Sequence, residues 1–320
     1  MAKDLKFSEY PFKVPNEKTI TAKCEKLVKD ITDSKDAKTC IAAMKKWNKY
    51  SNTLNTQCSI IYVLYSLETN NKKYVKAQDK VNEISPLLSN YSNKIAKFIT
   101  SAPFRAELEK KFGAYLLQMY DASLKAFDEK LIPDMIEENK LTSEYDQILG
   151  GAQIEFDGKV LNLSQLGKYM QDKDQEVRKA AAIAMDKWLG EHEEAIGTIY
   201  DKLVHLRDGM AKKLGFENFT ELGYLRLGRT DYNAKMVAGY RAQIAKDVVP
   251  VCNKLYKDQM KNLGIKNPQY YDYNLMFKSG NPVPAGEEKY LIDRAYEMYS
   301  ALGEESKEFF KFMMDHELLD

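Results

Sequence analysis

The sequence is poor in cysteine and has no long apolar runs. Its four cysteines, Cys24, Cys40, Cys58 and Cys252, lack the Cys-x-x-Cys spacing of metal clusters and redox motifs. The longest apolar run, residues 59–66, is far too short to cross a bilayer, and the first residues lack the apolar stretch of a signal peptide. Glycine-rich phosphate loops and Gly-x-Ser-x-Gly elbows are also missing. We therefore expect a cytoplasmic protein with reduced thiols and no membrane partner.

An excess of charge of either sign is also missing. Lysine and arginine number 48 against 47 aspartates and glutamates, which gives a net charge of +1 and argues against nucleic acid as a partner. The balance is uneven, because residues 1–100 carry 18 basic and 10 acidic side chains. This excess indicates a solvated basic face on an N-terminal helical layer, or a face that docks onto the acidic remainder.

Helical periodicity dominates the sequence. Between residues 37 and 70, apolar residues recur at spacings of three, four and seven, which places them on one face of a long helix. Similar patterns predict further helices over residues 72–98, 115–138, 174–214, 233–263, 287–302 and 304–320. Pro86, Pro133 and Pro250 lie inside three of them, and we expect Pro86 to kink or split its helix and Pro250 to kink another. The pattern predicts a mainly α fold of long antiparallel helices.

One β-hairpin interrupts the helices. Apolar side chains alternate through residues 152–163 on both sides of Asp157-Gly158, which is a strong hairpin signal. Residues 270–273, Tyr-Tyr-Asp-Tyr, are predicted to form a second, short strand-like segment.

Five blocks in this order resemble the oligoendopeptidase F branch of the M3 zinc metallopeptidases, in the part that precedes the zinc helix. They are the hairpin and residues 206–219, 222–232, 270–273 and 277–282. The resemblance is close over about residues 100–320 and looser before them. It implies the N-terminal lobe of a neurolysin-like or oligoendopeptidase fold. The implied parts are an N-terminal helical layer (1–113), an oligopeptidase F N-terminal-type region with the hairpin (114–200), and the start of the catalytic domain, truncated before the zinc motif (201–320).

The zinc motif of such enzymes, His-Glu-x-x-His, places two metal-binding histidines one helical turn apart, with a glutamate as general base. The chain has three histidines, His192, His205 and His316. His192 and His316 are each followed by glutamate, but Ile196 and Asp320 stand four positions on. Asp320 offers an oxygen ligand in principle, at the poorly held end of the chain. We therefore predict no catalytic residue, no metal ligand, no zinc and no hydrolysis for this chain alone, although its parent family uses zinc.

The resemblance also implies a channel that admits short unfolded peptides, so short peptides are the predicted partner. The alternative is a non-catalytic helical scaffold or peptide-binding protein that is complete at 320 residues. The last predicted helix ends on Leu318-Leu319 without a C-cap signal, so we expect the parent chain to continue. Apolar residues crowd the two last helices and predict self-association there.

Four residues are candidates for a substrate cleft. Arg226 and Arg229 could grip a peptide carboxylate through two parallel hydrogen bonds, or could instead form a structural ion network with Asp231 or Glu221. Tyr271 and Asp272 belong to the strand-like segment, which could lie beside an extended peptide or pack on the core as an ordinary β-segment.

Overall fold

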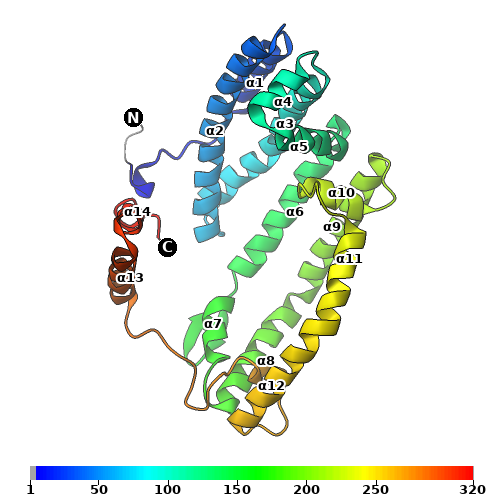
Figure 1. The fold of residues 1–320 in the computed structure, drawn as a ribbon. Coiled ribbons are helices and arrows are strands. Elements are labelled where there is room, and N and C mark those ends of the chain that lie inside the picture. The colour runs from blue at the N-terminus through cyan, green and yellow to red at the C-terminus, as the bar shows by residue number, and fades with distance from the viewer. Residues whose placement is uncertain (1–4, 320) are drawn as a thin grey trace.

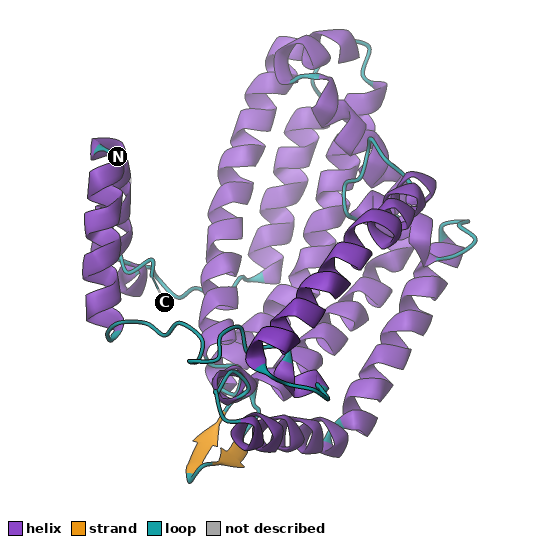
Figure 2. Cartoon of the chain, turned by 60° about the horizontal axis from the view of Figure 1, so that its bottom comes forward, coloured by secondary structure: helices purple, strands orange, loops and turns teal. Residues whose placement is uncertain are grey.

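The computed structural model describes residues 5–319, and its architecture is mainly helical with a single antiparallel hairpin (Figures 1 and 2). A first group of helices, α1 to α5, gathers at the top of the view in Figure 1. A short 3₁₀ turn, η1 (Phe7–Glu9), precedes these helices in the sequence. The helices are α1 (Glu17–Thr32), α2 (Ala37–Leu67), α3 (Lys72–Ser101), α4 (Arg105–Phe112) and α5 (Ala114–Ala126). The predicted fold class is therefore confirmed.

The helices of this group begin where the sequence supplies a capping side chain. Asn16 accepts a hydrogen bond from the Thr19 amide at 3.0 Å, and Asp36 accepts one from the Thr39 amide at 2.8 Å. Apolar side chains from α1 to α5 then pack into a shared core. Its buried members are Val28, Ile31, Ala37, Cys40, Ala43, Met44, Ile95, Ile99, Ala102, Phe104, Leu108 and Leu117.

A second group runs away from the first toward the opposite end of the molecule (Figure 1). It consists of η2 (Glu129–Leu131), α6 (Ile132–Gly150), β1 (Ile154–Phe156), β2 (Lys159–Leu161), α7 (Leu163–Tyr169), α8 (Gln175–Glu191), α9 (Glu193–Lys213) and α10 (Phe219–Arg226). The helix predicted over residues 115–138 is in fact two helices, with Pro133 in the first turn of α6. Proline has no N–H to contribute, so it is tolerated in a first turn, where that N–H would have no helical partner. The prediction that Pro133 lies inside a continuous helix was therefore wrong.

The hairpin forms as predicted. Asp157 and Gly158 both have positive φ, 51° and 69°, which matches the right-handed twist of the paired strands. Ile154 is buried from β1 and belongs to one cluster with Leu166 of α7 and Trp188 of α8. The hairpin is therefore held against α7 and α8 by one apolar face (Figure 2).

A long helical segment follows α10 and has no buried side chain over most of its length. It consists of α11 (Ala234–Gln243), a π-helical turn η3 (Ile244–Val248) and α12 (Val249–Leu263), so the helix is irregular just before Pro250, as predicted. Only Met260 and Leu263 are buried. Several large apolar side chains are exposed, namely Met236, Tyr240, Val248, Val249, Val251, Leu255 and Tyr256.

The last two helices, α13 (Glu288–Leu302) and α14 (Glu304–Asp315), pack on each other beside the rest of the fold, to which they are joined by an irregular segment (Figure 1). Phe310 is buried and stacks on Tyr299 with 4.7 Å between ring centroids. Leu302 and Phe309 are 76% and 62% exposed. These helices therefore keep much of their apolar surface in contact with solvent.

Within residues 5–319, no helix combines the length and the apolar character that crossing a membrane requires.

The exposed apolar surface of α13 and α14 generates a prediction. The protein should bind a hydrophobic dye and self-associate as its concentration rises, and the double substitution Leu302→Ser and Phe309→Ser should reduce both effects, because it removes apolar area from solvent contact. Dye fluorescence and sedimentation velocity measure this. Glu305→Ser, on the same exposed surface, is the matched control and should change neither. A dye signal that persists in full in the double variant would contradict the prediction.

Candidate functional site

Arg226 is held at the end of α10 by a carboxylate from another helix. Its Nη2 lies 2.6 Å from Oε2 of Glu138 in α6, and its Nη1 lies 3.3 Å from Oε1. Arg207 of α9 adds a third contact, with Nε 2.7 Å from Oε1 of the same glutamate. Both guanidinium groups lie 5.8 Å from the centre of the Phe219 ring. The partner of Arg226 is thus Glu138, not Asp231 or Glu221.

Glu138, Arg207 and Arg226, called here the Glu138 cluster, join α6, α9 and α10. Glu138 is 5% exposed, whereas the two arginine side chains keep 38% and 31% of their surface in solvent. Burial alone would raise the pKa of Glu138, but the hydrogen bonds and positive charges of Arg226 and Arg207 outweigh it and hold that pKa below its usual value. The glutamate is therefore ionised at neutral pH, and the cluster carries one net positive charge.

Arg229 has different partners from Arg226. Its guanidinium lies 4.6 Å from the ring centre of Tyr224 and 5.7 Å from that of Tyr232. These two rings meet edge to face, with 6.2 Å between centroids. Gly228, with φ of +64°, turns the chain between the two arginines. The sequence analysis gave Arg226 and Arg229 the same two possible roles, whereas the structure places Arg226 in an ion cluster and Arg229 on aromatic rings.

Residues 270–272 form a 3₁₀ turn, η4 (Tyr270–Asp272), and not the predicted strand. The carboxylate of Asp272 explains the turn, because its Oδ2 accepts the amide N–H of Gln269 at 2.8 Å. Asp272 is completely buried, with Oδ1 2.5 Å from Nη2 of Arg178, which is itself 1% exposed. Gln175 donates to the same carboxylate at 3.1 Å. A substrate therefore cannot reach Asp272 in this conformation, and its role here is to anchor the loop.

Tyr271 is half-buried beside this anchor and makes an edge-to-face contact with Tyr270 at 5.3 Å. The Tyr270 hydroxyl donates a hydrogen bond to Oδ2 of Asp186 at 2.5 Å, and this bond to a carboxylate raises the pKa of Tyr270. The aromatic segment is thus fixed to α8 on two sides. Of the two candidates here, Tyr271 is the one that keeps contact with solvent.

The two His-Glu pairs have structural roles at helix ends. His192 lies between α8 and α9, stacks on Trp188 at 4.1 Å, and its Nδ1 lies 2.8 Å from the Trp188 carbonyl oxygen. His316 follows α14, and its carbonyl oxygen accepts the Phe7 amide at 2.9 Å. Glu317 accepts the Ser8 amide at 3.1 Å, and these contacts with Ser8 lower the pKa of its carboxyl. The pair at residues 316–317 therefore holds the segment near the N-terminus against the end of α14.

The described residues do not fit a zinc site of the His-Glu-x-x-His type. No group of three or more histidine, cysteine, aspartate or glutamate side chains comes together within residues 5–319 in a way that could hold a metal ion. Asp320, the oxygen ligand considered from the sequence, lies outside the described residues. The absence of zinc from this chain stays a prediction.

Sequence reasoning missed Glu138, Arg178 and Arg207. Glu138 lies 69 and 88 residues from its two arginines, and Arg178 lies 94 residues from Asp272. No local pattern in the sequence marks these pairs. One signal was present, since a glutamate or arginine on the inner face of an amphipathic helix requires a partner of opposite charge.

Comparison with known proteins agrees with this architecture. Residues 7–127 match the model of the Peptidase M3 N-terminal domain. The PZ peptidase A structure, solved with an inhibitor, has a TM-score of 0.96 and 38% identity over 98% of this chain and 56% of its own. A putative oligoendopeptidase F from Bacillus anthracis str. Ames has the same TM-score and identity over 99% of this chain and 58% of its own. The chain belongs to the M3 peptidase family.

A third structure, described as a putative oligoendopeptidase F, gives a TM-score of 0.96 and 36% identity over 99% of this chain and 56% of its own. The curated proteins contain no significant match to the chain. This M3 family chain therefore spans a little over half the length of the solved structures that it matches. The oligoendopeptidase F resemblance seen in the sequence is confirmed.

The buried pair in this M3 family chain generates a stability prediction. Asp272→Ala should lower the free energy of unfolding by about 3–5 kcal/mol, because it leaves the buried Arg178 guanidinium without a counter-charge. Chemical denaturation and hydrogen exchange in residues 264–286 measure the effect. Removing both charges with Arg178→Met and Asp272→Leu should cost less than Asp272→Ala alone. Equal stability of Asp272→Ala and the wild type would contradict the anchoring role.

The Glu138 cluster generates a pH prediction. Because the pKa of Glu138 is lower in the folded protein than in the unfolded chain, the unfolded chain binds more protons as the pH falls below the ordinary glutamate pKa. The stability that this group contributes is thus complete above that pKa and is lost as the pH falls through the folded-state value. Glu138→Gln should cost about 2 kcal/mol at pH 7 and flatten the acid limb of the stability curve. Denaturant titrations from pH 7 down to pH 3 measure it. An unchanged acid limb would contradict the assignment, and Glu137→Gln serves as the neighbouring control.

Proposed function

We propose that the chain forms the N-terminal, peptide-binding part of a zinc-dependent oligopeptidase that hydrolyses short unfolded peptides inside an enclosed channel. The observation that supports this most strongly is the match to oligoendopeptidase F-type structures at a TM-score of 0.96 along nearly the whole chain. At 36–38% identity this likeness extends beyond the fold alone. The proposed compartment is the cytoplasm.

In this proposal, residues 1–320 supply walls of the channel and no ligand to the metal. The parts are those expected from the sequence, namely a helical layer (1–113), a region with the hairpin (114–200) and the start of the catalytic domain (201–320). Arg229 and Tyr271 are the candidates for contact with a bound peptide, since both retain some solvent exposure and are held rigidly by neighbouring rings. Arg226 is a further candidate for contact with the peptide, because Glu138 accepts only two of its guanidinium N–H groups.

The exposed apolar surfaces of α11 to α14 support a second part of the proposal, which concerns partners. Apolar area of this kind is typical of surfaces that pack against more protein. We propose that these surfaces contact the catalytic part of the peptidase in the whole enzyme, and that they mediate self-association when residues 1–320 stand alone. The dye-binding and sedimentation experiment on the Leu302→Ser and Phe309→Ser variant measures this self-association.

The hydrolysis of a short internally quenched peptide tests the proposed function. Residues 1–320 alone, with or without added zinc, should give no hydrolysis and no stoichiometric zinc binding, because no two histidines stand four positions apart. A fusion to the part of PZ peptidase A that this chain does not cover should gain hydrolysis that a chelator removes.

Two controls define the result. In the fusion, Arg229→Ala and Tyr271→Ala should raise KM more than they lower kcat, whereas Lys235→Ala, an exposed change near the start of α11, should alter neither. Zinc bound to residues 1–320 at one equivalent and lost in His316→Ala would overturn the assignment of the metal ligands to another part of the protein. A fusion that folds but shows no hydrolysis would favour the scaffold alternative.

A further inference from the structure

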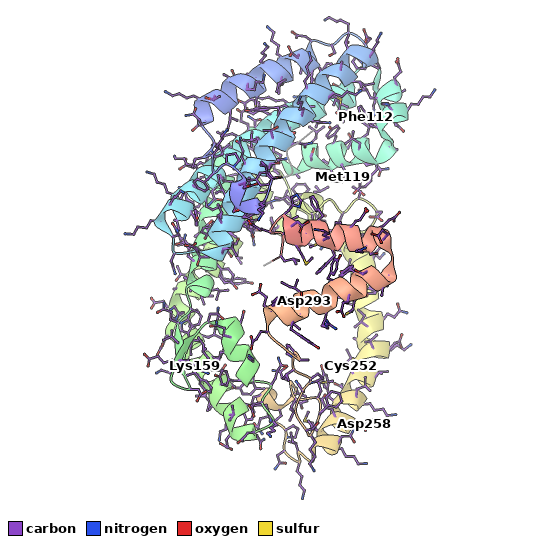
Figure 3. All side chains as sticks on the ribbon, turned by 90° about the vertical axis from the view of Figure 1, so that its left-hand side faces the viewer. Phe112, Met119, Lys159, Cys252, Asp258 and Asp293 are labelled. Atoms are coloured by element: carbon purple, nitrogen blue, oxygen red, sulfur yellow. The ribbon has the colours of Figure 1, made fainter. Side chains whose placement is uncertain are left out.

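The helices α13 and α14 make most of their contacts with each other. Phe310 of α14 is buried and stacks on Tyr299 of α13. Charged side chains of the two helices also pair within their own helix, as Asp293, labelled in Figure 3, does with Lys289 at 2.7 Å. The other such pairs are Arg294–Glu297, Lys307–Glu304 and Lys311–Asp315. Within residues 5–319, no ion pair or side-chain hydrogen bond joins residues 288–315 to another element, so the position of the α13–α14 pair is set at its two ends.

At one end, a short segment connects the α13–α14 pair to the rest of the fold. Asn281 anchors the chain before this segment, because its Oδ1 accepts the Met276 amide at 2.7 Å and its Nδ2 donates to Oε1 of Gln171 at 3.1 Å. Residues 282–286 follow and make no hydrogen bond to another element of the described structure. Backbone without such bonds changes its conformation at little cost in free energy. Residues 282–286 are therefore the place about which the α13–α14 pair can turn.

At the other end, η1 and the residue before it bind the end of α14 (Figures 1 and 3). The Phe7 amide donates to the carbonyl oxygen of His316 at 2.9 Å, and the Ser8 amide donates to Oε2 of Glu317 at 3.1 Å. Lys6 adds a charge, with its Nζ 3.6 Å from Oε1 of Glu317. Ser8 and Glu317 are 309 positions apart in the sequence, so this contact closes a long loop of the chain.

The same segment is anchored in the N-terminal helical layer by Phe12. Its ring lies 5.7 Å from the ring of Tyr74 in α3, and Nζ of Lys73 lies 4.4 Å from its centre. Phe12 also packs against three buried residues of α2 and α3, namely Ile61, Ala77 and Val81. Residues 6–12, called here the N-terminal arm, thus bridge the helical layer and the end of α14.

Glu317 has a backbone conformation that is uncommon for its residue type. Its φ is +57°, in the left-handed region. The Glu317 amide donates to the Met314 carbonyl at 3.3 Å and the Leu318 amide to the Met313 carbonyl at 2.9 Å, the Schellman arrangement that ends many helices. Glycine is the usual residue at this position, because a side chain there costs free energy. Glutamate supplies what glycine lacks, a carboxylate that reaches the N-terminal arm, so its side chain has a role beyond ending the helix.

We propose that the N-terminal arm and Glu317 form a latch. The closed latch holds the α13–α14 pair against the helical layer, and the open latch lets this pair turn about residues 282–286. The side chains of Lys6 and Glu317 keep 55% and 42% of their surface in solvent, where ion pairs are weak, so the two states interconvert readily. The latch involves no metal and does not depend on the proposed hydrolysis of peptides.

Protonation of Glu317 opens the latch. The hydrogen bonds from Ser8, and after them the charge of Lys6, hold the pKa of Glu317 below its usual value. The closed latch therefore binds fewer protons than the open one, so it is favoured above the ordinary glutamate pKa and is lost as the pH falls through the lowered value. The other charged side chains near the latch have partners elsewhere, namely Glu9 on the Lys6 amide, His316 on the Phe312 carbonyl oxygen and Asp315 on Lys311.

Hydrogen exchange and a distance measurement on residues 1–320 test the latch. Glu317→Gly removes the carboxylate but suits the left-handed backbone, so the amides of α14 should keep their protection. The Phe7 and Ser8 amides should exchange about tenfold faster, the usual effect of losing one hydrogen bond. Spin labels on p-acetylphenylalanine in place of Asn52 in α2 and Glu305 in α14, both exposed, should report a broader distribution of distances. Glu308→Gln, a change at another exposed glutamate of α14, is the control and should alter neither measurement.

Glu317→Gln separates the charge of this residue from its shape. The side-chain oxygen of glutamine can still accept the Ser8 N–H, but it does not titrate. In the wild type, the distances should broaden as the pH falls below the ordinary glutamate pKa, over the range in which circular dichroism shows intact helices, whereas in Glu317→Gln they should not change with pH. Unchanged exchange and distances in Glu317→Gly, or an equal response to acid in Glu317→Gln, would overturn the proposal and leave the proposed peptidase function untouched.

Discussion

The position of α6 in the fold depends on polar contacts more than on apolar ones. Few of its side chains are buried, and two of these, Glu138 and Ser143, are polar. Glu138 connects α6 to α9 and α10 through Arg207 and Arg226, while Ser143 accepts a hydrogen bond from Asn82 of α3 at 2.9 Å. Because directional contacts of this kind have one satisfied arrangement, they fix the register of α6 where apolar packing alone would tolerate sliding.

The pair of Arg178 and Asp272 fixes the position of an irregular segment in the same way. The residues between α12 and α13 contain several prolines and glycines and bury little apolar surface of their own, so their conformation must come from specific contacts. Asp272 supplies them by binding Arg178, Gln175 and the Gln269 amide. The contacts of Asp272 with α8 therefore fix the point at which the chain leaves the rest of the fold on its way to α13.

What the sequence could predict was local. The hairpin follows from Asp157-Gly158 and its alternating neighbours, and the start of α11 follows from Asn233, whose side chain accepts the Met236 amide at 3.1 Å. The turn at η4 could not be predicted, since the aromatic residues favour a strand and only the buried bond from Asp272 to Gln269 imposes the tight turn.

The contacts of the candidate residues could not be predicted, for a related physical reason. Arg226 and Arg229 were chosen as candidates from their chemistry, but the partner of Arg226 could not be chosen, because a long-range ion pair leaves no periodic trace in a sequence. Glu138 is one of the few buried residues of α6, and its position relative to Arg226 becomes defined only when α6 and α10 pack together. A residue type can thus be chosen from sequence, whereas its protonation state and its remaining free donors need the fold.

The outer surface of α13 and α14 lacks a partner within the described residues. The exposed side chains Leu302 and Phe309 of α13 and α14 offer apolar area and no buried donor, so any apolar protein surface of matching shape satisfies them. Contact at these two helices therefore selects a partner by the area and the shape of its apolar surface.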